Sequence, residues 1–115
     1  MLELQRKDGQ WTWGKGFETF CPVGPCLVPR DEVDFQKFRV RTFVDGQKKQ
    51  DAAVSEMIFS VDDLIAYITS FMTLEPGDLI ATGTPAGVGP VQPGAKIQID
   101  IPGIGVLENT VIAEA

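Results

Sequence analysis

The chain has 115 residues, of which 43% are apolar and 23% charged, and its formal net charge is −6. This length allows one domain with a modest core, and the composition is typical of a soluble globular protein. The acidic charge argues against nucleic acid or an anionic membrane as a partner, because both require a basic patch. No apolar run approaches the roughly 20 residues of a membrane span. The sequence has only two cysteines, Cys21 and Cys26, so we expect reduced thiols in a cytoplasmic protein.

The sequence contains no histidine. This excludes Ser-His-Asp and Cys-His catalytic groups and His-ligated zinc from within the chain. Any chemistry must therefore rest on carboxylates, lysines, hydroxyls, backbone dipoles or a hard metal ion bound through oxygen.

The first third of the chain is rich in loop signals. Residues 1–14 show no hydrophobic period, so no element is predicted there. From Lys15 to Pro25, glycines and prolines exclude a helix, and two phenylalanines would anchor the loop to a core. Cys26–Pro29 is predicted to form a short strand, followed by a charged surface turn.

Two pairs of strands are predicted further along the chain. Residues 38–44 alternate apolar and polar side chains, and Asp45-Gly46 is a hairpin signal from which residues 47–53 return as a second strand. Residues 96–101 also alternate, and residues 106–112 are predicted to form the last strand. The pattern indicates a mainly β, α+β chain.

One helix is predicted between these pairs. Ser60 is a good N-cap, and Asp62 and Asp63 follow in the first turn, where the helix dipole favours acidic groups. The helix is expected to end near Thr73. Its apolar face would carry Leu64, Ile65, Ile68, Phe71 and Met72.

The stretch from Leu74 to Pro90 is a candidate ligand loop. Leu79–Ala81 is predicted to be a buried strand that leads into Thr82-Gly83-Thr84-Pro85. Such a loop offers hydroxyls and bare backbone N–H groups that a ligand can approach closely. The alternatives are a Gly/Pro-rich connector without a ligand and ST-turns formed by the two threonines.

Few other residues suggest chemistry. Lys15, between two glycines, could hold a substrate carboxylate or stabilise an oxyanion, although most lysines are simply solvated. Asp62 and Asp63 are placed to cap the helix rather than to bind a metal. The chain alone therefore offers two candidate anion-binding loops and neither a catalytic base nor a metal cage.

Two segments are more specific together than apart. KGFETFCPVGP (Lys15–Pro25) and MTLEPGDLIATGTPAGVGP (Met72–Pro90), in this order, closely resemble motifs of the fumarylacetoacetate hydrolase family. The likeness is to bacterial 2-hydroxyhepta-2,4-diene-1,7-dioate isomerases, acylpyruvate hydrolases and oxaloacetate decarboxylases. It extends over residues 1–115 but matches only the C-terminal part of that family's catalytic domain. The resemblance implies a single partial domain with a β-roll of mixed sheets and one helix, incomplete at the N-terminus, and usually a homodimer.

The resemblance also implies a chemistry, of a kind used in aromatic catabolism. A Mg²⁺ ion (or Mn²⁺ or Ca²⁺) would chelate the 2-oxo or 2-hydroxy acid end of a diacid and stabilise an enolate during C–C cleavage, isomerisation or decarboxylation. By position, Lys15 resembles the family's catalytic lysine near the metal and substrate oxygens. Gln5 matches a substrate-contacting glutamine, and Thr19 a residue that lines the metal site. Gly83 and Thr84 match the loop that holds the substrate carboxylate.

The sequence departs from the family pattern in one important respect. The family's metal carboxylates, a Glu-x-Glu pair and a later Asp, lie upstream of the lysine and are absent here, as is the His-Glu lid of hydrolytic members. We therefore expect a fragment, a truncated product or one half of a split enzyme, with doubtful metal binding of its own. The alternative is a non-catalytic subunit or assembly module that pairs with an N-terminal partner or self-associates.

Overall fold

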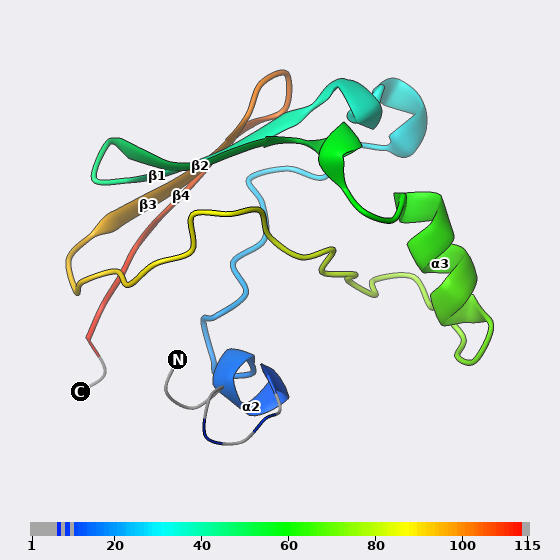
Figure 1. The fold of residues 1–115 in the computed structure, drawn as a ribbon, viewed down its shortest axis with the longest axis horizontal. Coiled ribbons are helices and arrows are strands. Elements are labelled where there is room, and N and C mark those ends of the chain that lie inside the picture. Colours follow the sequence, from blue (N-terminus) through cyan, green and yellow to red (C-terminus); the bar gives the residue numbers. More distant parts are fainter. Residues whose placement is uncertain (1–6, 8, 10, 114–115) are drawn as a thin grey trace.

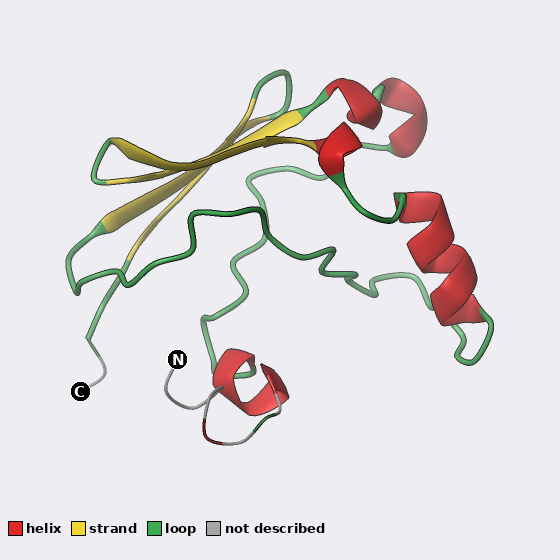
Figure 2. Ribbon diagram, in the orientation of Figure 1, coloured by secondary structure: helices red, strands yellow, loops and turns green. Residues whose placement is uncertain are grey.

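The structure is a computed structural model that describes residue 7, residue 9 and residues 11–113. Four strands form one antiparallel sheet in the order β2-β1-β3-β4. The sheet lies at one side of the molecule, and helix α3 lies apart from it (Figures 1 and 2). The elements are α2 (Trp11–Lys15), the 3₁₀ turns η1 (Arg30–Glu32) and η2 (Phe35–Lys37), β1 (Arg39–Val44), β2 (Gln47–Ala53), η3 (Val54–Glu56), α3 (Val61–Thr69), β3 (Lys96–Ile101) and β4 (Gly105–Thr110).

The two predicted strand pairs are confirmed. β1 and β2 form a hairpin whose turn residues, Asp45 and Gly46, have φ values of 49° and 76°. Two successive positive φ values define the type I′ turn that suits the twist of a hairpin, which is why Asp-Gly is a reliable signal. β3 pairs with both β1 and β4 and so joins the hairpin to the end of the chain.

The sheet has one apolar face and one charged face. The cross-strand partners place like side chains together, as expected for an antiparallel sheet with one face toward a core. The apolar face carries Val40, Val44, Ala52, Ile97, Ile99, Ile101 and Leu107. On the charged face, ion pairs join Arg39 to Asp51, Arg41 to Asp100, Lys48 to Asp51 and Lys96 to Glu108.

Helix α3 begins as predicted but ends sooner. The Ser60 hydroxyl accepts a hydrogen bond from the Asp63 N–H, and the Asp63 carboxylate accepts one from the Ser60 N–H, so a complete capping box starts the helix. The last helical residue is Thr69 rather than Thr73. The Ser70 hydroxyl donates to the carbonyl of Tyr67, an interaction typical of a helix end.

The capping box should make α3 sensitive to acid. Hydrogen bonds from the Ser60 hydroxyl and N–H lower the pKa of Asp63. Because the folded pKa lies below the unfolded one, this stabilisation is present above the unfolded pKa and is lost as pH falls through the folded pKa. We expect Asp63→Ala to lose helical circular dichroism at neutral pH and to match the wild type once the pH is low enough to protonate Asp63 in the folded chain. Asp31→Ala serves as the exposed control, and an equal loss in both variants would contradict the assignment.

Three local predictions were wrong. Leu79–Ala81 is not a strand, and Leu79 is 66% exposed, because no described segment lies beside it to complete a ladder. Cys26–Pro29 likewise forms no strand. Helix α2, of five residues, was not predicted, since one short turn of helix leaves no readable hydrophobic period.

The chain leaves much apolar surface uncovered. In the described part of the chain, Ala95 is the single apolar residue classed as buried, and large side chains such as Phe71 and Ile112 are well exposed. The accessible surface is 9241 Å², whereas a compact monomer of this mass exposes about 6,200 Å². The radius of gyration is 15.5 Å, against about 13 Å for a compact domain of this length. None of the helices in the described residues has the length and apolar run needed to cross a bilayer.

Candidate functional site

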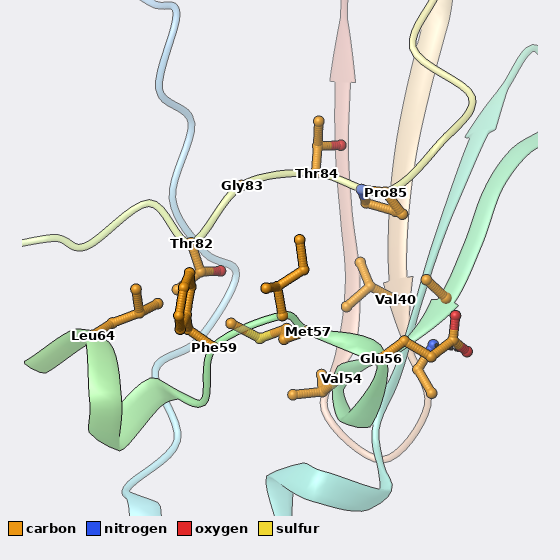
Figure 3. A pocket seen from close by; sticks show the side chains of 13 residues that line it. Val40, Val54, Glu56, Met57, Phe59, Leu64, Thr82, Gly83, Thr84 and Pro85 are labelled. Carbon is orange, nitrogen blue, oxygen red and sulfur yellow. Dashed lines mark hydrogen bonds between the residues drawn. The ribbon is translucent and has the colours of Figure 1, made fainter.

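The Thr-Gly-Thr-Pro loop borders an open hollow of about 520 Å³. Figure 3 shows Thr82, Gly83, Thr84 and Pro85 along one side of the hollow, with Met57 and Phe59 opposite. The other lining residues come from β1, the end of β2, η3 and the start of α3. They are Val40, Ala52, Ala53, Val54, Glu56, Ile58 and Leu64.

This hollow is mostly apolar inside. Glu56 is the ionisable residue among those that line it, and its carboxylate accepts a hydrogen bond from the backbone N–H of Ala53. On the loop, the Thr82 hydroxyl lies on the side of the hollow (Figure 3). The arrangement suits a ligand with a polar end at the loop and an uncharged body in the hollow.

Gln50 of β2 fixes the loop. Its Nε2 donates to Thr84 Oγ1 at 2.7 Å and to the carbonyl oxygen of Pro85 at 2.9 Å. In Figure 3 the Thr84 side chain projects to the opposite side of the loop from Met57, whereas the Thr82 side chain projects to the side on which Met57 and Phe59 lie. Gly83 lies between the two threonines with φ of 100°, a conformation that favours glycine. The two threonine side chains therefore face opposite sides of the loop.

Gly87 holds the following part of the loop against the sheet. A Cβ built at Gly87 would lie 2.0 Å from the carbonyl oxygen of Lys49 and 3.0 Å from Cγ of Gln50. Gly87 also has φ of 110°, so both its conformation and its close approach require the absence of a side chain. The loop is thus seated on β2 at two neighbouring points.

The segment that begins at Lys15 lies apart from the Thr-Gly-Thr-Pro loop. Lys15 is the exposed last residue of α2, and its Nζ lies 4.8 Å from the ring centroid of Trp11. Figure 1 shows α2 at the far end of a long connection from the sheet. Among the described residues no hydrogen bond joins Lys15 to Thr84. Thr19 is exposed with φ of 66°, a left-handed conformation unusual for threonine. Gln5 lies outside the described residues.

The carboxylates do not gather into a metal site. In the portion of the chain that the structure describes, no three acidic, cysteine or histidine side chains are grouped so that they could hold a metal ion. Asp62 accepts a bidentate pair of hydrogen bonds from Arg30, and Asp63 caps α3. These residues therefore do not fit a divalent cation, which requires several oxygen ligands.

Gln50 is the site residue that sequence patterns did not single out as functional. The register places it opposite Thr42, on the apolar face that also carries Val40. A polar side chain on an apolar face is a local inconsistency that often marks a functional position. That inconsistency depends on the strand pairing and cannot be seen in the sequence alone.

Comparison with known proteins places the chain in context. The family model described as fumarylacetoacetate hydrolase C-terminal matches residues 2–112. A mitochondrial oxaloacetate decarboxylase of Dictyostelium discoideum is 50% identical over 99 residues, which are 85% of this chain and 45% of that protein. The chain spans about half the length of the curated relatives it matches.

Solved structures also match most of the chain. A 2-hydroxyhepta-2,4-diene-1,7-dioate isomerase from Mycobacterium marinum is 50% identical with a TM-score of 0.91, covering 96% of this chain and 43% of that one. A maleylpyruvate hydrolase from Sphingobium sp. SYK-6, in complex with manganese(II) and pyruvate, is 39% identical with a TM-score of 0.80. That match covers 84% of this chain and 37% of the hydrolase.

Proposed function

Because the chain belongs to the fumarylacetoacetate hydrolase family, we propose that residues 1–115 form the C-terminal portion of a catalytic domain. The enzyme would act on 2-oxo or 2-hydroxy-dienoic diacids. The observation that carries this proposal is the seating of the Thr-Gly-Thr-Pro loop on β2, beside an apolar hollow. A rigid loop at the mouth of a hollow is a suitable place to fix the charged end of a substrate.

Gly83 and Thr84 would hold a substrate carboxylate. Thr84 Oγ1 already accepts a hydrogen bond from Gln50, so its own proton is left to donate to an oxygen in front of the loop. Gly83 has no side chain to block an approach to its backbone. Together they would orient the acid at the loop.

Lys15 would stabilise negative charge that develops on the substrate oxygens. This role is based on the resemblance of the segment Lys15–Pro25 to the family motif. The Lys15 ammonium group is exposed and accessible. Thr19 would line the same region. For Lys15 to reach a carboxylate held at Thr84, the connection between α2 and the sheet must bring Lys15 close to the Thr-Gly-Thr-Pro loop.

Divalent metal use is consistent with the manganese complex of the Sphingobium hydrolase. We propose Mg²⁺ for this protein. Since the described residues do not fit such an ion, its acidic ligands must come from a polypeptide segment other than residues 11–113. Bound there, the ion would act as a Lewis acid toward the substrate.

Relatives carry the names isomerase, hydrolase and decarboxylase. A substrate panel on two preparations tests the proposed function. The first preparation is this chain alone; the second is this chain with the part of the Mycobacterium marinum isomerase that it does not cover. We expect no Mg²⁺-dependent turnover of oxaloacetate or acylpyruvates by the first and measurable turnover by the second. Robust turnover by the chain alone in a clean preparation would overturn the proposal that the metal ligands lie elsewhere.

An alternative function is that of a non-catalytic subunit or assembly module. The excess of exposed surface over a compact monomer favours it, because exposed apolar faces and sheet edges promote association. An N-terminal partner could cover these exposed faces and edges, or a second copy of the chain could do so, as in a homodimer.

Light scattering after size-exclusion chromatography tests this alternative. We expect the chain alone to associate. The part of the Mycobacterium marinum isomerase that this chain does not cover, called the complementing segment below, should convert the aggregate or oligomer into a defined complex. A stable monomer of 12.5 kDa would contradict both expectations.

A further inference from the structure

We propose that Gln50 is a positioning residue, which acts through Thr84 to make the site select hydrogen-bond acceptors such as a carboxylate. The inference deepens the proposed function and rests on it for the identity of the ligand. The geometry of Gln50 and the loop, however, can be tested without any ligand.

A β-bulge in β2 directs Gln50 toward the loop. Thr42 of β1 pairs with Gln50 and Phe43 pairs with Lys48, so Lys49 is an extra residue without a partner on β1. A bulge of this kind bends the strand and re-aims its side chains, and such bulges occur often beside active sites. Here the bulge places Gln50 on the apolar face, from which its side chain reaches the loop.

The same bulge supplies the seat for the loop. The Lys49 carbonyl lies where a side chain at Gly87 would be, so the loop backbone approaches the bulge as closely as glycine allows. The loop therefore contacts consecutive residues of β2 through a close backbone approach and through a pair of hydrogen bonds. Since both contacts depend on the bulge, one irregularity in the sheet determines where Thr84 lies.

The hydrogen bonds also determine which way Thr84 donates. The Pro85 carbonyl can only accept, so the Gln50 atom bonded to it must be the amide nitrogen, which has two protons to donate. Its second proton goes to Thr84 Oγ1, which makes the Thr84 hydroxyl an acceptor on the side of Gln50. The hydroxyl proton is consequently directed to a ligand. A carboxylate can accept it, whereas an amide nitrogen or an ammonium group cannot.

The first experiment measures loop order without ligand. In the chain combined with the complementing segment, backbone ¹⁵N order parameters at Gly83, Thr84 and Gly87 should be about 0.85 in the wild type and fall below about 0.6 in Gln50→Leu. Gln50→Glu keeps the shape of the side chain but cannot donate to the Pro85 carbonyl, so it should loosen the loop as well. Gln36→Leu, at an exposed glutamine in η2, is the matched control and should leave the loop unchanged. Wild-type order in both Gln50 variants would overturn the positioning role.

The second experiment measures selectivity in the chain combined with the complementing segment. We expect Gln50→Leu to weaken binding of pyruvate roughly tenfold, and binding of aminoacetone, in which an ammonium group without an acceptor replaces the carboxylate, by less than about twofold. An equal loss for both ligands would indicate a merely structural role and overturn the inference. A wild type that does not prefer pyruvate to aminoacetone would overturn carboxylate binding at the loop, while the order parameters would still decide whether Gln50 positions Thr84.

Discussion

Replacing Gly87 by alanine is expected to detach the Thr-Gly-Thr-Pro loop from β2. A Cβ at this position would lie 2.0 Å from the Lys49 carbonyl oxygen, far inside van der Waals contact, and alanine would also be strained at φ of 110°. Either the loop leaves the sheet or the bulge shifts, and we expect the free energy of unfolding to fall by about 2–4 kcal/mol. The measurement is urea denaturation of the chain with its complementing segment.

Two other glycines of the loop are matched controls. Gly83 has φ of 100° but nothing within 4 Å of its Cβ position, so Gly83→Ala should show the cost of backbone strain alone, about 1 kcal/mol. Gly89 has open space and no positive φ, so Gly89→Ala should change stability by less than about 0.5 kcal/mol. A Gly87→Ala variant as stable as Gly89→Ala would show that the loop does not rest on β2.

Replacing Lys15 by methionine is expected to give the largest loss of activity. Methionine keeps most of the length of the side chain but removes the charge that we assign to stabilising the substrate oxygens. We expect kcat/KM of the complemented protein to fall by about 10²–10³-fold, which is typical for loss of one group that stabilises developing negative charge.

The control for Lys15 is another exposed lysine. Lys37→Met removes a lysine that pairs with Asp34 on the protein surface, so it should leave kcat/KM within about twofold of the wild type. Thr84→Val should lose roughly tenfold, mainly through KM, because it removes one hydrogen bond to the carboxylate. Equal activities of Lys15→Met and Lys37→Met would show that the lysine motif has no catalytic role here.

The regular elements could be predicted from sequence because their causes are local. Alternation in residues 96–101, the Asp45-Gly46 turn and the Ser60 cap each depend on a few neighbouring side chains, and each prediction is confirmed. The end of α3 was predicted too late. Apolar spacing continues to Met72, but the backbone N–H groups of Ser70 and Phe71 bond to carbonyls three residues back, as at a tightened helix end.

Features that depend on distant segments could not be predicted. Leu79–Ala81 has the composition of a buried strand, yet composition does not supply the neighbouring strand that burial requires. The polar residues around Lys49 form no sequence pattern that predicts a bulge. Gln50 could therefore not be recognised as the residue that positions Thr84. The roles of Lys15, Thr19, Gly83 and Thr84 came from resemblance and remain predictions.

The most direct measurement is a titration of this chain with the complementing segment of the Mycobacterium marinum isomerase, at a fixed concentration of Mg²⁺ and oxaloacetate. We predict that the rate of oxaloacetate consumption rises from the uncatalysed background and saturates at an equimolar ratio, and that removal of the metal by a chelator abolishes it. Turnover that is complete before any segment is added would contradict the assignment of the metal ligands to another segment. A stable complex without turnover at any ratio would contradict the proposed enzymatic function and favour an assembly module.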